Sequence, residues 1–147
     1  MQRSSKIAII ALTLAFVSAS GDARAELFSK AYAFKPDTTL QVGTETPGGL
    51  RLDEVEFVFP KEGKDGGTFN GPKVKVSISN LGSASAKIGL SVAVTDVDGR
   101  LVAVASGGTK LFPLRAGRQI VYTLPIDGVR AELAKGTVFR ISIESTP

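Results

Sequence analysis

Apolar and polar residues alternate along several short segments of this chain, and this pattern constrains its fold more than any other feature. In the segments 74–78, 88–94 and 139–143, every second residue is Val, Ile, Leu or Phe, and the residues between them are polar or small. Successive side chains of a strand point to opposite faces, so each segment has one face suited to a core and one suited to water. The pattern predicts antiparallel sheets, because strands of a parallel sheet are apolar on both faces.

Less regular alternation extends the predicted core at residues 54–59 and 120–124. The inward positions expected there are Val55, Phe57, Phe59, Ile120, Tyr122 and Leu124. The segment 101–105 is apolar on both faces. That pattern predicts either a more deeply buried strand or an edge strand in contact with another surface.

Turn-forming residues separate these segments. Asp98-Gly99 lies between two predicted strands and predicts a hairpin, because both residues tolerate positive φ. Residues 80–83 predict a second turn, and an irregular loop is expected from Ser106 to Gly117. Only residues 129–135 have a helical pattern, which Gly136 should end. Residues 50–147 are therefore predicted to form one all-β domain, an immunoglobulin-like antiparallel β-sandwich of about seven strands.

Residues 26–49 form an extension before this domain, and they allow two interpretations. Phe28, Tyr32 and Phe34 would share one face of an extended segment, and Leu40 and Val42 would share a face after the break at residues 36–37. One interpretation is an added N-terminal strand that covers the sandwich. The other is a mobile arm whose aromatic side chains dock on a partner.

The first 25 residues have the pattern of a cleaved secretory signal peptide. Arg3 and Lys6 precede an apolar run over residues 7–17, and Ala23-Arg24-Ala25 fits the small-residue cleavage pattern. The run is too short for a membrane-spanning helix, so no membrane span is expected after cleavage. Export is predicted, to the periplasm rather than fully outside the cell. An exported domain without cysteine has no disulfides and depends on its core for stability.

The residue inventory excludes many chemistries. The chain has no histidine and no cysteine. It therefore lacks the residues of Ser-His-Asp and Cys-His nucleophile systems, and it lacks the usual ligands of zinc, copper and haem. We therefore expect no catalytic, metal or cofactor-binding residues and no cofactor. Asp96 and Asp98 suggest a weak calcium site at most, since the stretch lacks the ligand spacing of a calcium-binding loop. A turn is the preferred interpretation.

Neither the net charge nor the carboxylate pairs point to a particular function. Half of the formal net charge of +4 lies in the predicted signal peptide, and the remaining basic residues are scattered, so no nucleic-acid partner is expected. Glu54 and Glu56 would project from one strand face roughly 7 Å apart, a spacing that glycosidases use across a cleft. These two residues instead lie side by side on the predicted solvent face, which favours a structural role.

From residue 52 to residue 143 the chain resembles the immunoglobulin-like accessory domains of exported bacterial proteins, of the FxLYD type. The segment LDEVEFVFP resembles their opening strand. The segment FNGPKVKVSISNLGSASAKIGLSVAVTDVDGRLV resembles their central block, and FPLRAGRQIVYTL resembles their loop with a Leu-x-Pro-Gly turn. Ala116 replaces the usual proline, and Val94-Thr95-Asp96 replaces the aromatic part of the name motif. The resemblance implies a non-catalytic module with no catalytic residues to carry over.

The leading functional hypothesis is a non-catalytic exported domain that contacts another envelope or secreted protein. The candidate surface comprises the edge-like segment 101–105 and two loop aromatics, with the residues Phe69, Val102, Val104 and Phe112. The alternative is a small-ligand or carbohydrate-binding module that uses loop aromatics with Arg115 and Arg118. An enzyme that relies on carboxylates alone is the third hypothesis. The identity of the partner and the oligomeric state are left open.

Overall fold

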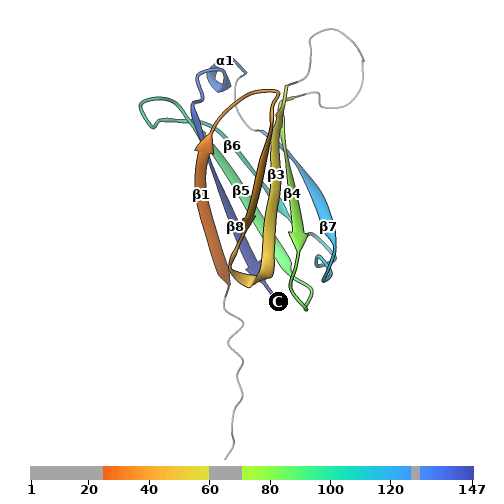
Figure 1. Cartoon of the computed structure of the whole chain (residues 1–147). Coiled ribbons are helices and arrows are strands. Elements are labelled where there is room, and N and C mark those ends of the chain that lie inside the picture. Colours follow the sequence, from red (N-terminus) through yellow and green to blue (C-terminus); the bar gives the residue numbers. More distant parts are fainter. Residues whose placement is uncertain (1–24, 60–70, 127–129) are drawn as a thin grey trace, which may run out of the picture.

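The computed structural model describes residues 25–59, 71–126 and 130–147, so the predicted signal peptide and Phe69 lie outside the described residues. Eight strands form two antiparallel sheets of four strands that pack face to face (Figure 1). The elements are β1 (Glu26–Ala33), β2 (Thr39–Glu45), a 3₁₀ turn η1 (Pro47–Gly49), β3 (Leu50–Val58), β4 (Lys73–Asn80), β5 (Lys87–Thr95), β6 (Leu101–Gly108), β7 (Gln119–Pro125), α1 (Arg130–Leu133) and β8 (Val138–Thr146).

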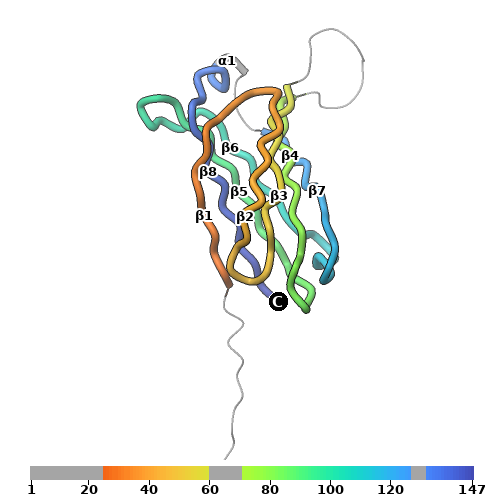
Figure 2. Tube along the Cα trace, viewed as in Figure 1, coloured from red at the N-terminus to blue at the C-terminus, as the bar shows by residue number. Residues whose placement is uncertain are grey.

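The strand order shows how the chain passes between the layers. The first sheet has the order β1-β8-β5-β6 and the second the order β2-β3-β4-β7. The consecutive strands β2 and β3, β3 and β4, and β5 and β6 are antiparallel neighbours within one sheet, whereas the other four connections cross from one sheet to the other. As a result β1 and β2 are edges on one side of the sandwich, and β6 and β7 are neighbouring edges on the other side (Figure 2).

The core lies between the sheets and contains most of the predicted inward positions. Three predicted segments are confirmed in full, and their buried residues are Val74, Val76, Ile78, Ile88, Leu90, Val92, Val94, Phe139, Ile141 and Ile143. Four phenylalanine and tyrosine rings, those of Tyr32, Phe34, Phe57 and Phe139, stack or meet edge to face with centroids between 4.7 and 5.4 Å apart. The regular alternation thus identified the central strands correctly.

Two inward assignments differ from the structure. Ile120 is 38% exposed, so its predicted burial is wrong, whereas Tyr122 and Leu124 on the same strand are buried. Ile120 pairs with Ile78 near the start of β7, where the edge strand has no further neighbour to cover it. Phe59 follows the end of β3 and is only half-buried against the core.

A β-bulge in β3 explains why its alternation was hard to follow in the sequence. Leu52 pairs with Ile78 and Glu54 pairs with Ser77, so Asp53 is an extra residue on β3. The bulge shifts by one position the residues whose side chains point into the core. Leu50 and Leu52 lie in the core before the bulge, and Val55 and Phe57 lie in the core after it. The sequence pattern revealed only the second pair, because a strict two-residue period cannot span an inserted residue.

The predicted turns are present, but one boundary is wrong. The hairpin at residues 96–100 joins β5 and β6, and Gly99 has φ of 78° with its N–H donating to Asp96 O at 3.1 Å. The irregular loop was expected from Ser106, but β6 continues to Gly108. Glycine can still form the hydrogen bonds of the ladder, and here the close approach of β5 requires a residue without a side chain. The helix is a single turn, and Gly136 N–H donates to Leu133 O at 3.0 Å at its end.

Residues 26–49 form two strands, which raises the number of strands from about seven to eight. β1 pairs with β8 in the first sheet, and β2 pairs with β3 in the second. Phe28, Tyr32, Leu40 and Val42 are half-buried against the core, and Phe34 is buried. Each sheet therefore takes one edge strand from this extension.

Candidate functional site

The segment predicted to be apolar on both faces forms the first half of edge strand β6. Ala103 and Ala105 are buried against the second sheet, while Val104 on the opposite face is 39% exposed. Val102 is an extra residue where β6 leaves register with β5, and its side chain is half-buried against the core. The two apolar faces thus have different surroundings, a core on one side and solvent on the other.

The backbone of β6 presents unpaired groups at the sheet edge. Thr109 N–H donates to Ile88 O at 2.8 Å, so these two residues form a hydrogen-bonded pair. Along an antiparallel ladder, hydrogen-bonded and non-hydrogen-bonded pairs alternate from this point. The N–H and C=O groups of Val104 and Ser106 therefore point away from β5. In the part of the chain that the structure describes, no backbone hydrogen bond joins β6 to an element other than β5.

The other three edge strands carry features that discourage pairing with another chain. On β1, the Lys30 ammonium lies 5.4 Å from the centre of the Tyr32 ring. On β2, the register shift around residues 42–43 marks a bulge at which Gly43 has φ of 59°. β7 ends at Pro125, which has no N–H to donate. β6 has the sequence LVAVASGG, without charge or proline, and its one irregularity is at Val102.

A loop with two exposed large apolar side chains follows the β6 edge. Phe112 is 82% exposed, and its neighbour Leu111, which the sequence interpretation missed, is equally exposed. The base of this loop is held by a bridge between Leu114 and Ala86, whose N–H groups each donate to the other's carbonyl at 2.8 and 2.9 Å. The buried Asn80 adds to this, since its Nδ2 donates to Leu114 O at 2.9 Å. The loop therefore displays its apolar tip from a fixed base.

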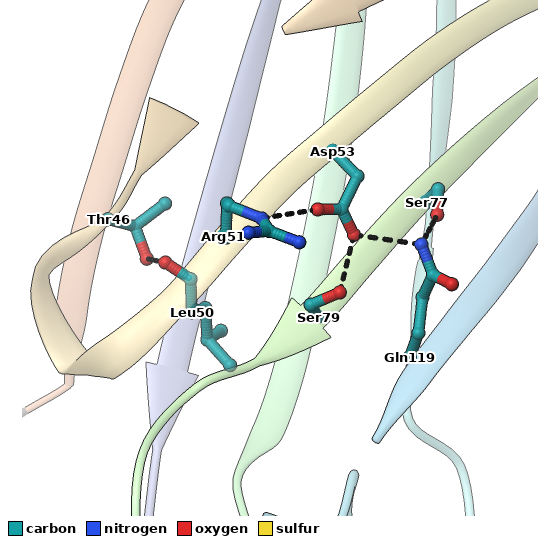
Figure 3. Close-up of polar contacts among 7 residues, drawn as sticks. All are labelled: Thr46, Leu50, Arg51, Asp53, Ser77, Ser79 and Gln119. Carbon is teal, nitrogen blue, oxygen red and sulfur yellow. Dashed lines mark hydrogen bonds and ion pairs between the residues drawn. The ribbon is translucent and has the colours of Figure 1, made fainter. Parts of the chain in front are cut away.

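The outer face of the second sheet is charged, and its charges are largely paired. Asp53, at the bulge, accepts hydrogen bonds from Arg51 Nε at 2.6 Å, Ser79 Oγ at 2.6 Å and Gln119 Nε2 at 3.1 Å (Figure 3). Gln119 Nε2 also contacts Ser77 Oγ at 3.0 Å. The network spans β3, β4 and β7. It stabilises the bulge rather than forming an open site, because the Asp53 carboxylate already has three donors.

Asp53 should make folding stability depend on acid. Burial opposes its ionisation, but the hydrogen bonds from Ser79, Arg51 and Gln119 outweigh that cost and hold the pKa of the carboxyl below its ordinary value. The carboxylate therefore adds stability above the ordinary aspartate pKa of about 3.9, and this contribution is lost as the pH falls through the folded-state pKa. We expect Asp53→Asn to lower the free energy of unfolding at pH 7 by about 1–3 kcal/mol.

Chemical denaturation between pH 7 and pH 2 tests this expectation. The loss of stability on acidification should be shallower in the variant than in the wild type, because the variant lacks the linked proton. Asp98→Asn, in the exposed β5–β6 turn, is the matched control and should leave stability at pH 7 nearly unchanged. Parallel acid profiles for wild type and Asp53→Asn would contradict the assignment.

The other candidate carboxylates also lie on this face. Glu54 Oε2 accepts a hydrogen bond from Gln41 Nε2 at 2.7 Å, and Glu56 Oε2 lies 3.2 Å from Lys75 Nζ. Both line a shallow depression of about 380 Å³ with Lys75, Ser77, Val121 and Thr123. Each glutamate has a neighbour on the adjacent strand, and no second acid faces either one across this depression.

The predicted calcium candidate is a turn. Asp96 Oδ1 accepts hydrogen bonds from the N–H groups of Asp98 at 2.9 Å and Arg100 at 2.8 Å, which closes the hairpin. Among the described residues, no three side chains of metal-ligating type converge. Asp96 uses its side chain to shape the backbone, as aspartate commonly does in turns.

A hollow of about 500 Å³ lies at the end of the sandwich where β1 begins and β8 ends. It is lined by Glu26, the glycines of η1, the loop between β4 and β5, and residues 145–147. Arg115 and Arg118, the residues considered for ligand binding, are exposed and do not line it. Phe112 does not line it either, so the predicted ligand-binding residues are not brought together there.

No protein-family model matches the chain, and no curated protein matches it. The resemblance to FxLYD-type domains therefore rests on the strand and turn residues named above. None of the helices within the described ranges has the length and apolar character that crossing a membrane requires.

Proposed function

We propose that this chain is an exported, non-catalytic immunoglobulin-like domain that contacts another envelope or secreted protein through edge strand β6. The observation that carries the proposal is the contrast between β6 and the other three edges. Among these four edge strands, only β6 has neither a charged residue nor proline, and an exposed apolar loop follows it.

The sheet topology supports the immunoglobulin-like part of the proposal. In immunoglobulin domains, strands B and E are neighbours in one sheet and C and F are neighbours in the other. Here β4 and β7 are neighbours in the second sheet, and β5 and β8 are neighbours in the first. The connections β4–β5 and β7–β8 cross between the sheets, as B–C and E–F do. In this correspondence β3 is strand A, and β6 lies beside C where variable-type domains add a strand.

Two features depart from that arrangement. β1 from the N-terminal extension pairs with β8, in the place where strand G would pair with F. Among the described strands, none lies beside β7 in the place of strand D, so β7 is an edge. The turn before β7 is compatible with the resemblance despite Ala116, because Gly117 has φ of 68° and Arg118 N–H donates to Arg115 O at 3.2 Å. This geometry is that of a type II turn, in which proline at the second position is common but not required.

Strand addition explains how β6 would bind. An extended partner segment can accept and donate main-chain hydrogen bonds along a free edge, while its alternate side chains give specificity. The groups offered here are the backbone N–H and C=O of Val104 and Ser106. Leu111 and Phe112 add apolar area beyond the end of β6. Compared with this surface, the ligand-binding alternative has less support, because its residues do not meet in a cavity.

In-cell photo-crosslinking tests this proposal directly. A photoreactive residue at Ser106 should give a discrete adduct with an exported protein other than a second copy of this chain, which mass spectrometry can identify. Replacing Val102 and Val104 with lysine should reduce that adduct by about tenfold or more, since lysine on an edge strand opposes strand addition. Val104 is 39% exposed and Val102 is half-buried against the core, so the melting temperature of the double variant shows whether the fold tolerates the change.

Val121→Lys is the matched control, because Val121 is 55% exposed on β7, the edge of the other sheet. This variant should leave the adduct unchanged, and the melting temperature of each variant shows that it remains folded. A probe at Ser106 that captures no protein, or an adduct that survives the double lysine substitution, would overturn the assignment of β6 as the contact strand.

A further inference from the structure

The outer face of the first sheet has an arrangement of side chains that matches itself. Strand pairing places its outward residues in rows across β1, β8, β5 and β6. The middle row consists of Ser29, Ser142, Ser91 and Ser106. On one side of the serines, toward the C-terminal end of β1, the next row consists of Ala31, Arg140, Ala93 and Val104. On the other side, the next row consists of Leu27, Glu144, Gly89 and Gly108.

Two opposite charges in these three rows have no partner within the face. Arg140 and Glu144 are both exposed, and neither forms an ion pair or a side-chain hydrogen bond with any residue that the structure describes. They are four residues apart on β8, roughly 13 Å along the strand, which is too far for them to pair with each other. Most charges on the outer face of the second sheet, in contrast, are paired within that sheet.

Ser142 lies midway between these charges, so a half-turn about the serine row exchanges their positions. A second copy rotated in this way and placed face to face brings Arg140 of each copy over Glu144 of the other. The same rotation brings Leu27 over Ala31 and Val104 over Gly108, so that in these two rows each exposed large apolar side chain meets a small one. The small side chains of the middle row let the two sheets approach closely along the axis.

We propose that the chain forms a two-fold symmetric dimer through this sheet face, with a second copy as the partner. The charges and the apolar contacts are self-complementary, as an isologous interface requires. Four strands spaced about 4.8 Å apart, with some seven residues each, give a face of roughly 450 Å². Two such faces bury roughly 900 Å², less than the roughly 1,200 Å² at which stable specific interfaces begin, so we expect a weak dimer with Kd on the order of 10–100 μM.

This dimer goes beyond the proposed function, because it uses the face of the first sheet and leaves the hydrogen-bonding groups of β6 free. The rotation axis runs across the strands, so the two β6 edges lie on the same side of the dimer. A dimer would therefore present two copies of the β6 edge to partners.

Charge reversal in sedimentation velocity experiments tests the dimer. The purified wild-type protein should change from monomer to dimer between about 1 μM and 1 mM. Arg140→Glu and Glu144→Arg alone should each raise Kd by about 100-fold or more, because each places two like-charged pairs in the interface. The double variant restores two opposite-charge pairs, so its Kd should return to within about tenfold of the wild-type value.

Lys75→Glu, on the outer face of the second sheet, is the control and should leave Kd unchanged. A wild-type protein that stays monomeric up to 1 mM would overturn the dimer, and so would a double variant as weak as the single ones. Either result leaves the β6 crosslink to test the proposed function separately, since an adduct with a different exported protein has a different mass from an adduct with a second copy.

Discussion

Replacing Phe57 with alanine is expected to lower the free energy of unfolding by about 3–5 kcal/mol, among the largest effects of any single truncation in this chain. Phe57 lies at the centre of the aromatic cluster, with ring centroids 4.7 Å from Phe34 and 5.0 Å from Phe139, and it is 2% exposed. Phe57 lies on β3, Phe139 lies on β8, and Phe34 directly follows β1, so removing the middle ring leaves a cavity between the sheets. A chain without disulfides depends on this core for most of its stability.

Urea denaturation followed by circular dichroism measures this loss. Phe112→Ala is the matched control, because the same side chain is removed from a position that is 82% exposed. The control should change stability by less than about 0.5 kcal/mol. Similar losses from the two substitutions would show that Phe57 is not packed as described.

The second large effect is expected at Gly108, at the end of β6. Its φ is 149°, and a Cβ at this position would overlap the carbonyl oxygen of Ile88 and lie 2.9 Å from the carbonyl carbon of that residue. Both neighbours are backbone atoms of the paired strand, which cannot move without breaking the ladder. Gly108→Ala should therefore cost about 3 kcal/mol or more, as a clash added to backbone strain.

Gly89 gives a matched control because it pairs with Gly108 across the two strands. A Cβ on Gly89 would meet no heavy atom closer than 3.8 Å. Gly89→Ala should therefore change the free energy of unfolding by less than about 1 kcal/mol, with a gain possible because alanine restricts the unfolded chain. Equal melting temperatures for the two alanine variants would contradict the close approach of β5 and β6.

The strands with regular alternation could be predicted because burial on one face leaves a local record in the sequence. Val74, Leu90 and Ile141 are buried as expected, and the turn at Asp98-Gly99 follows from residues that tolerate positive φ. Leu50 and Leu52 were missed because the bulge at Asp53 interrupts the two-residue period. Ile120 was misassigned because its exposure depends on the position of β7 at a sheet edge, which is not encoded locally.

Some residues of the candidate surfaces could likewise be selected from the sequence, and others only from the fold. Val104 and Phe112 could be selected from the sequence, since one lies in a strand apolar on both faces and the other in a loop. The importance of Leu111, Arg140 and Glu144 became visible only when the fold placed them on an exposed tip or on one open face. Residues that share a surface across four strands are distant in sequence, so no local pattern connects them.

The sequence by itself determined that this chain forms antiparallel sheets around an apolar core, and it ruled out histidine- and cysteine-based chemistry. Those properties depend on residue types and on alternation along single strands. Only the tertiary structure decided which strands are neighbours, that residues 26–49 supply an edge to each sheet, and that β6 is the edge without charge or proline. The physical reason is that strand partners are chosen by packing between segments far apart in the chain, and alternation within one segment fits many partners equally well.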